Sequence, residues 1–173
     1  MEQPSGGRIM AMKHRKIKFI SAVTLAVLIL ASAVMFTWQQ KMVLTIEEQE
    51  TGKVYATLPV KAGDELSFQW EHSFEHIPWY EYYEIKKDGS FLLHTIAVAG
   101  FGAGIPAEMD CTYRYEDGLI YMEDIGSEFP QFNWINSQTA LKNIKVNGEL
   151  LLNGADMPHH VKMTLYIKNG KGA

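Results

Sequence analysis

The feature that most constrains this chain is an uncharged segment of 22 residues near its start, residues 19–40. Lys18 precedes it and Lys41 follows it. A helix of about 20 apolar residues spans the hydrocarbon core of a bilayer and satisfies its own backbone hydrogen bonds there. Trp38 lies near the end of the segment, where an amphipathic indole prefers the membrane–water interface. The segment therefore predicts one transmembrane helix that delivers the rest of the chain to one side of a membrane.

The charges on either side of the segment predict its orientation. Residues 1–18 contain five Lys or Arg residues and one acid, a net charge of +4, whereas the remaining chain has 11 basic and 19 acidic residues, a net charge of −8. Basic flanks resist translocation. We therefore expect residues 1–18 to stay in the cytoplasm, residues 19–40 to lie in the cell membrane, and residues 41–173 to form an extracytoplasmic domain.

Two alternatives for the apolar segment stay open. Ala31-Ser32-Ala33 has the small-x-small form of a signal-peptidase site, which would make the segment a cleaved signal peptide. The apolar run continues past Ala33 to Trp38, however, which is longer than a usual signal core and favours an uncleaved anchor. The other alternative is a buried core helix in a cytoplasmic protein.

Composition limits what the exported part can be. Its 133 residues suit one domain with an ordinary core, and its acidity argues against nucleic-acid binding. The single cysteine, Cys111, excludes an intrachain disulfide. We expect Cys111 to be a buried apolar residue, and a reactive thiol is the alternative.

Short alternating segments separated by tight turns fill the rest of the chain. Asp88-Gly89, Asp117-Gly118 and Asn147-Gly148 are the strongest turn signals, because the two-residue hairpin loop that they favour needs positive φ at both positions. Only residues 132–141 are compatible with a helical turn. The strands that we expect cover residues 42–48, 53–60, 66–71, 79–87, 91–98, 112–116, 119–123, 144–146, 150–152 and 161–168.

This pattern predicts the fold class. Short strands at near-regular spacing, with no helices alternating between them, are typical of antiparallel sheets. We expect an all-β domain, an antiparallel β-sandwich or barrel-like domain behind one N-terminal transmembrane helix.

The first candidate site lies in residues 70–84, WEHSFEHIPWYEYYE. If the alternating apolar residues of 66–70 face the core, His72 shares their side, and on the next strand Glu81 lies between two core-facing aromatic residues. A buried carboxylate needs a partner, so we expect a hydrogen bond between His72 and Glu81. The pair would form a ligand-binding or proton-handling corner, or it would only fix the register of the hairpin.

The second candidate is the glycine-rich motif Gly102-Ala103-Gly104-Ile105-Pro106. Glycine permits positive φ and a close approach of the backbone, and exposed N–H groups in such a loop can hold an anion. The alternative is a tight passage between two strands. Taken together, the ligand- or partner-binding residues that we expect are His72, Ser73, Glu81, Gly102, Ala103, Gly104 and Pro106.

Metal binding and hydrolysis are weaker alternatives. His72, Glu75 and His76 are close in sequence, but their spacing suits a helix, and the following Pro78 argues against one. Ser73 is adjacent to His72, and neighbouring side chains on an extended segment point to opposite sides. We therefore expect no catalytic residue, no metal and no cofactor.

Two motifs resemble a known bacterial family, the domain of unknown function 1850 family. Its pattern is an aromatic-x-His-Ser, a Pro-x-x-Glu some residues later, and a Gly-Ala-Gly-Leu-Pro. This chain has Trp70-Glu71-His72-Ser73, then Pro78 and Glu81, then Gly102 to Pro106, and the resemblance spans about residues 44–167. Ile105 replaces the commoner Leu, and Trp70 stands where Tyr is usual, which removes a hydroxyl group.

The resemblance implies a role in transport. Members of this family are often encoded beside tripartite ATP-independent periplasmic (TRAP) transporters of the TAXI type, which take up small organic acids, and the family supplies no established catalytic residues. We therefore expect a membrane-anchored accessory or binding domain associated with such a transporter, with the transporter subunits as partners. The alternative is an envelope sensor or adhesion module with no transport role.

Overall fold

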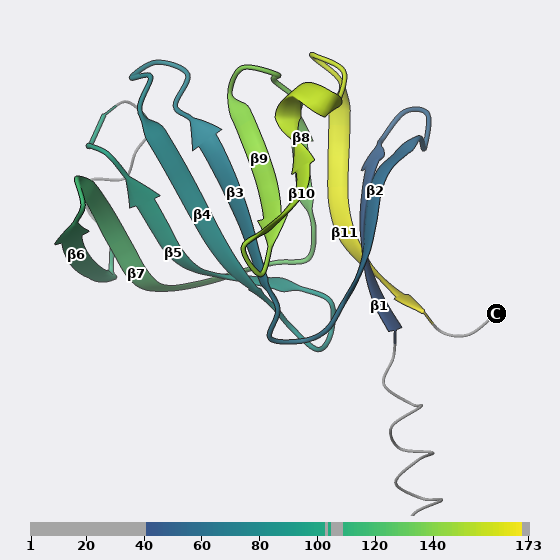
Figure 1. Ribbon diagram of the computed structural model, residues 1–173. Helices are drawn as coiled ribbons and strands as arrows, with labels where there is room; N and C mark the ends of the chain where they lie inside the picture. The colour runs from purple at the N-terminus through teal and green to yellow at the C-terminus, as the bar shows by residue number, and fades with distance from the viewer. Residues whose placement is uncertain (1–40, 103, 105–108, 171–173) are drawn as a thin grey trace, which may run out of the picture. The chain divides into compact units, whose positions relative to one another are not determined.

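The computed structural model describes residues 41–102, 104 and 109–170, which form two antiparallel sheets (Figure 1). Residues 1–40 lie outside the described part, and with them the expected transmembrane segment 19–40. Across the described residues, no helix is long and apolar enough to cross a membrane. The all-β prediction and the antiparallel pairing are confirmed.

The four-stranded sheet joins the beginning of the domain to its end. Its strand order is β2 (Val54–Val60), β1 (Lys41–Glu48), β11 (Lys162–Gly170) and β8 (Phe132–Ile135). The central pair is β1 with β11, in register from Lys41 opposite Gly170 to Glu48 opposite Met163. The first and last strands of the domain therefore lie next to each other.

The seven-stranded sheet holds most of the remaining chain. Its strands are, in spatial order, β10 (Glu149–Asn153), β9 (Leu141–Val146), β3 (Glu65–Glu71), β4 (Pro78–Ile85), β5 (Phe91–Val98), β7 (Leu119–Phe129) and β6 (Thr112–Glu116). The chain enters this sheet after β2, leaves it after β7 to form β8, returns for β9 and β10, and leaves again for β11.

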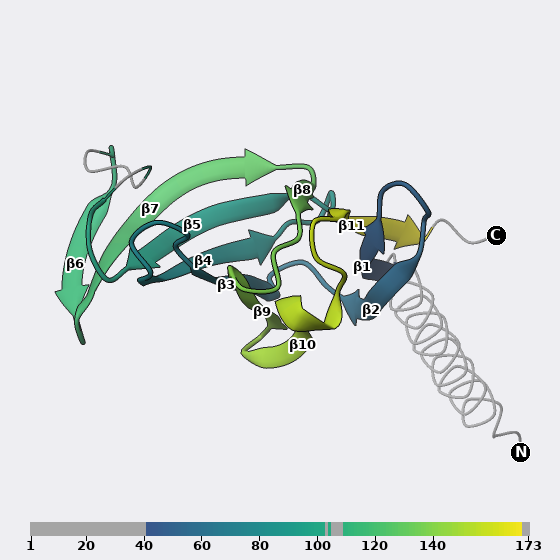
Figure 2. The ribbon, with the colours of Figure 1, turned by 90° about the horizontal axis from the view of Figure 1, so that it is seen from above.

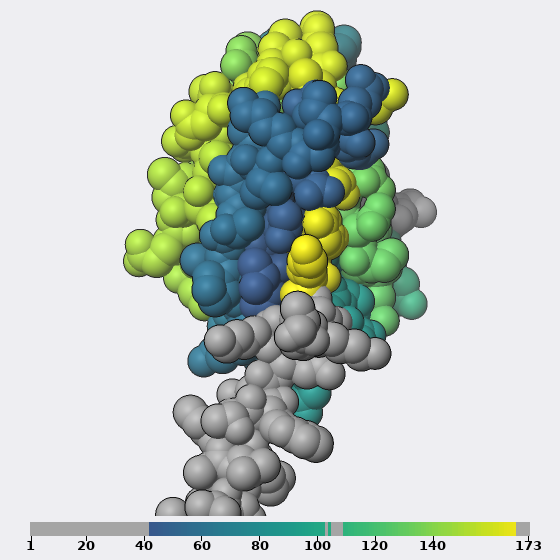
Figure 3. All heavy atoms as spheres, turned by 90° about the vertical axis from the view of Figure 1, so that its right-hand side faces the viewer, coloured from purple at the N-terminus to yellow at the C-terminus, as the bar shows by residue number. Residues whose placement is uncertain are grey.

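Two views show how the sheets are placed. From above (Figure 2), the four-stranded sheet lies at one side of the seven-stranded sheet, and β7 and β6 extend away from it. The side view (Figure 3) shows β2, β1 and β11 side by side, with β10 next to β2. The two sheets therefore come together along the β2–β10 margin.

All ten expected strands are present, nine of them within three residues at their ends, whereas β7 continues six residues beyond the expected end at residue 123. The structure corrects the prediction at residues 132–141. Residues Phe132–Ile135 form β8, and only a single turn follows, in which the N–H of Leu141 donates to the carbonyl of Ser137 (3.0 Å). A four-residue strand is too short to show a period in sequence, which is why the pattern did not reveal it.

The predicted hairpin turns are confirmed at two positions and corrected at one. Asp117-Gly118 has φ values of 49° and 77°, and Asn147-Gly148 has 51° and 81°. At Asp88-Gly89 only the glycine has positive φ, at 91°. Asp88 Oδ1 instead accepts hydrogen bonds from the backbone N–H (3.0 Å) and the hydroxyl (2.7 Å) of Ser90, which stabilise a different turn.

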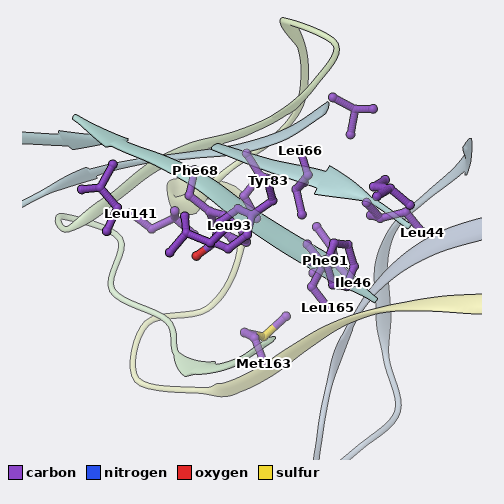
Figure 4. Close-up of a cluster of buried hydrophobic side chains, with 14 of the residues drawn as sticks. Leu44, Ile46, Leu66, Phe68, Tyr83, Phe91, Leu93, Leu141, Met163 and Leu165 are labelled. Carbon is purple, nitrogen blue, oxygen red and sulfur yellow. The ribbon is translucent and has the colours of Figure 1, made fainter. Parts of the chain in front are cut away.

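The core lies between the two sheets (Figure 4). Alternation along β3 buries Leu66 and Phe68, while the residues on either side of each are half-buried. From the four-stranded sheet, Leu44 and Leu165 are fully buried. Cys111 packs at the margin of this core and is half-buried rather than buried as expected, with a free thiol.

One ring connects the two layers. Phe132 of β8 lies 4.8 Å from the ring centroid of Tyr83, 4.8 Å from that of Phe91 and 5.2 Å from that of Phe68. Those three residues come from three strands of the other sheet, and centroid distances of this size fall within the favourable range for aromatic pairs. The short strand β8 is thereby fixed against the centre of the seven-stranded sheet.

The buried side chain of Asn136 holds the chain segment beyond β10 in place. The side chain of Asn136 is fully buried, and its Nδ2 donates to the carbonyl oxygens of Gly154 and Pro158, both at 3.0 Å. Gly154 begins the short 3₁₀ helix Gly154–Asp156, which the sequence did not predict. A Cβ atom at Gly154 would overlap the backbone carbonyl of Leu141, so only glycine fits there.

We expect Gly154→Ala to lower the free energy of unfolding by about 1–3 kcal/mol, because two backbone segments would have to move apart. Urea unfolding of the full chain in detergent measures this. Gly102→Ala is the matched control. Its Cβ would also meet a neighbour, but that neighbour is the exposed side chain of Glu75, which can rotate away, so the expected change is within about 0.5 kcal/mol. Equal losses in the two variants would contradict this account.

Candidate functional site

Strand pairing places Glu81 on the core-facing side of the seven-stranded sheet. Phe68 lies directly opposite Glu81 on β3, and Ile96 lies opposite it on β5. Both neighbours are buried, so the predicted orientation of Glu81 toward the apolar side is confirmed. One carboxylate therefore interrupts an otherwise apolar face.

The partners of Glu81 are aromatic. Its Oε2 atom accepts hydrogen bonds from Trp70 Nε1 (3.1 Å) and from the hydroxyl of Tyr83 (3.3 Å). Burial raises the pKa of Glu81, and the hydrogen bonds from its aromatic neighbours oppose that rise without cancelling it. The same environment raises the pKa of Tyr83, through burial first and through the nearby Glu81 carboxylate second.

Trp79 lies beside this group and links it to His72. Its Nε1 atom is buried without a hydrogen bond of ordinary geometry, yet the indole is close enough to Glu81 to help lower the pKa of that carboxyl. The ring of His72 stacks on Trp79, with centroids 5.9 Å apart and planes 2° apart. The indole of Trp79 therefore lies between the histidine and the carboxylate environment.

The expected hydrogen bond between His72 and Glu81 is wrong. Nδ1 of His72 instead accepts from the backbone N–H of Glu75 (3.1 Å). The reason is that β3 ends at Glu71, so the alternation of sides along the strand does not continue to His72. The strand pattern predicted Glu81 correctly because Glu81 lies inside β4.

The β3–β4 turn, residues 72–77, is closed by its own hydrogen bonds. The N–H of His72 donates to Ile77 O (2.8 Å), and the N–H of His76 donates to His72 O (2.9 Å). His76 has a positive φ of 54°, which lets the chain reverse. Ser73 is exposed in this turn, as its alternative interpretation as a turn residue requires.

The glycine-rich motif meets this turn. A Cβ at Gly102 would lie 2.7 Å from Cγ of Glu75, and one at Gly100 would lie 3.9 Å from Cδ1 of Ile77. Gly104 has a φ of 78°, which favours glycine. Ala103 and Pro106 lie outside the described residues. The β3–β4 turn and the glycine-rich motif therefore come together at one end of the domain, whereas Glu81 is bound by aromatic side chains of the sheet.

Both candidate motifs lie in a region that is similar to a known protein family. Residues 66–151 match the model of the family described as Domain of unknown function (DUF1850). The chain belongs to this family. It matches no curated protein and no solved structure.

The DUF1850 match covers the candidate site. It begins inside β3 and ends inside β10, so it includes His72, Glu81 and the glycine-rich motif. It is narrower than the expected span of residues 44–167, because β1, β2 and β11 lie outside it. Those three strands supply most of the four-stranded sheet that covers the core of the DUF1850 region.

The histidines of this DUF1850 chain do not gather into a metal centre. Among residues 41–102, 104 and 109–170, no group of three or more His, Cys, Asp or Glu side chains could hold a metal ion. His159 and His160 stack on each other with centroids 3.8 Å apart, and the ring of His159 accepts a hydrogen bond from the N–H of Gln138 (3.2 Å).

Charged groups also surround the turn of the DUF1850 site. Glu71 forms an ion pair with Lys142 (2.8 Å) and a longer one with His76 (3.6 Å). Lys142 is the main cause of the lowered pKa of Glu71, by hydrogen bonding and by charge. The pair is partly exposed, so its contribution to stability is small, and it mainly positions the end of β3.

Sequence reasoning missed two features of the site. Trp70 and Tyr83 were counted as core aromatics, and their polar atoms are the partners of Glu81. Phe74 and Phe101 are exposed at 73% and 42% of their surface, although a phenylalanine is ordinarily buried. Phe74 follows Ser73, and Phe101 lies between Gly100 and Gly102. These small neighbours in loops were the sequence signal for the exposure of both rings.

We expect Glu81→Gln to stabilise the protein increasingly as pH rises above about 4.5. The pKa of Glu81 is raised by burial above its ordinary value of 4.5, so the folded state binds this proton more tightly than the unfolded state does. Ionisation of Glu81 therefore costs stability as pH rises through the raised pKa, and glutamine does not ionise.

Urea unfolding of the full chain at a series of pH values measures the difference between Glu81→Gln and the parent. The difference should be smallest at acid pH. Glu128→Gln, which changes an exposed carboxylate on β7, should leave the pH dependence unchanged. A parent protein that gains stability over Glu81→Gln with rising pH would refute the assignment.

Proposed function

We propose that this DUF1850 chain is a membrane-anchored extracytoplasmic binding domain that assists a TAXI-type TRAP transporter in the uptake of small organic acids. One observation carries the binding role: the two motifs that the sequence singled out meet, with Gly102 packed on Glu75 and His72 stacked on Trp79. The transporter as partner rests on the resemblance to the family and on the gene neighbourhood that this resemblance implies.

The hydrogen bonds of Glu81 and His72 support a binding role, because they fix the surroundings of both side chains. Oε2 of Glu81 already accepts from Trp70 and Tyr83, and Nδ1 of His72 already accepts from Glu75 N–H. These bonds hold the aromatic rings and the turn in one arrangement, which is what a pre-formed recognition surface needs.

The anchoring part of the proposal rests on the sequence. Residues 19–40 are long enough and apolar enough to span a bilayer, and the basic residues before them favour a cytoplasmic N-terminus. The domain begins at Lys41, immediately after the segment.

Uptake of radiolabelled small organic acids tests the transport role. We expect uptake to fall in cells that lack this chain and to recover when the full chain is restored. His72→Ala should recover uptake about fivefold less well, because truncation of a contact residue costs about 1 kcal/mol or more. Tyr115→Ala, an exposed residue on β6, should recover it fully. Unchanged uptake in the deletion strain would overturn the transport role and favour a sensor or adhesion module.

A reporter enzyme that folds only outside the cytoplasm tests the topology. Fused after the last residue it should be active, and fused before residue 19 it should be inactive, because basic flanks stay inside. The mass of the purified chain separates an anchor from a signal peptide, since cleavage would remove the first 30 or so residues. An inactive C-terminal fusion would overturn the extracytoplasmic location.

A further inference from the structure

Among the residues that the structure describes, no strand pairs with the outer side of β6. This strand ends the order of the seven-stranded sheet, and Figure 2 shows it on the side away from the four-stranded sheet. Two other edge strands are better protected, because β10 lies next to β2 and β2 contains Pro59. β6 has no proline, no glycine and no bulge in its pairing with β7. Its outer side is therefore ready to accept another strand.

The backbone of β6 offers hydrogen bonds on this outer side. The turn Asp117-Gly118, with positive φ at both residues, closes β6 onto β7 through the pair of Glu116 and Leu119. Hydrogen-bonded pairs alternate along antiparallel strands, so residues 112, 114 and 116 direct their backbone groups to β7. The N–H and C=O groups of Tyr113 and Tyr115 therefore point away from β7, toward the open side.

The side chains of β6 carry charges of both signs in fixed positions. Arg114 forms ion pairs with Glu116 and with Glu123 of β7, where its Nη2 atom lies 2.8 Å from Glu123 Oε1. The guanidinium carbon of Arg114 also lies 4.0 Å from the centroid of the Tyr121 ring. Arg114 and Glu116 are two residues apart in the strand, so both project from one face of the sheet, and Tyr115 projects from the other.

This pattern is complementary to itself. When two copies of β6 pair antiparallel about Tyr115, Arg114 of each copy lies opposite Glu116 of the other, and the charges alternate in sign around the two-fold axis. The same register brings the outward backbone groups of the two Tyr115 residues together as a hydrogen-bonded pair. A register centred on Arg114 would instead set two Arg114 side chains opposite each other, which is unfavourable. Charge therefore selects the register centred on Tyr115.

From this complementarity we infer that two copies of this chain associate through β6, antiparallel and centred on Tyr115. Such a contact uses the same surface on both copies, so it closes on itself and joins the two seven-stranded sheets into one. A foreign strand with charges of one sign would meet a like charge at Arg114 or at Glu116, whereas a second copy meets opposite charges at both. This dimer needs neither the membrane nor the transporter of the proposed function.

Disulfide trapping of the full chain in detergent tests this inference, in a Cys111→Ser background that removes the native thiol. Tyr115→Cys places two thiols at the two-fold axis, where Cα atoms of a hydrogen-bonded pair are about 5.5 Å apart, within the range of a disulfide. Thr112→Cys is the matched control, because it is also exposed on β6 but three residues from the axis, so its two copies are roughly 20 Å apart. On oxidation with copper phenanthroline, we expect Tyr115→Cys to form the covalent dimer about tenfold faster than Thr112→Cys. An edge of five residues is a small interface, and trapping captures the pairs as they exchange.

Charge reversal in the Tyr115→Cys chain tests the register. Glu116→Arg puts a positive charge opposite Arg114 of the other copy, so we expect trapping to slow about tenfold. Glu128→Arg makes the same charge change on β7, five residues beyond the part that pairs with β6, and should leave the rate unchanged. The side chain of Glu116 is 60% exposed, so the melting temperature of Glu116→Arg should match that of the parent. Raising the salt to about 0.5 M should restore part of its trapping rate, because salt screens the repulsion.

The outcomes are decisive and separate from the proposed function. Equal trapping rates for Tyr115→Cys and Thr112→Cys would overturn the dimer, because chance encounters trap both positions alike. A Tyr115→Cys dimer that forms equally fast with Glu116→Arg would overturn it too, since the register depends on that carboxylate. If the deletion strain loses uptake and no dimer is trapped, the transport role stands and the dimer is overturned.

Discussion

The packing of Phe132 between the sheets is the interaction on which the rest of this domain depends. β8 has only four residues, and a strand that short gains little from its own hydrogen bonds. Its ring meets Phe68, Tyr83 and Phe91, and the hydroxyl of Thr164 donates to its carbonyl from β11 (3.1 Å). Aromatic pairs of this geometry add roughly 0.5–1.5 kcal/mol each beyond the burial of their surface. One residue of β8 thus contacts three strands of the other sheet.

The same aromatic cluster sets the environment of Glu81. Tyr83 contacts Phe132 with its ring and Glu81 with its hydroxyl, and Phe68 stacks on Trp70, whose indole also binds Glu81. The carboxylate is therefore held by side chains whose rings belong to the core. Its pKa is raised because that core excludes water from it. Stability and the geometry of the candidate site are consequently properties of one cluster.

Local chemistry explains which parts of this structure could be predicted from the sequence. Asp117-Gly118 and Asn147-Gly148 predicted their turns because glycine, asparagine and aspartate tolerate positive φ. Glu81 was placed on the correct face because it lies inside a strand with a period of two. His72 was misplaced because the end of β3 at Glu71 depends on the turn that follows, and no residue pattern marks that end. The pairing of β1 with β11 depends on contacts between distant residues, which alternation along one strand does not encode.

The pairing of β1 with β11 also has a consequence for the timing of folding. Tyr166 of β11 donates to Glu47 of β1 across 119 residues of chain, and β11 supplies the fully buried Met163 and Leu165. β1 and β2 therefore have no completed sheet to join until β11 has been synthesised. The DUF1850 region, which lies between β2 and β11 in sequence, emerges from the ribosome before β11 does. One face of its seven-stranded sheet is then still exposed to solvent. Apolar strands of this chain therefore stay exposed until synthesis is nearly complete. Chaperones bind such exposed apolar surfaces.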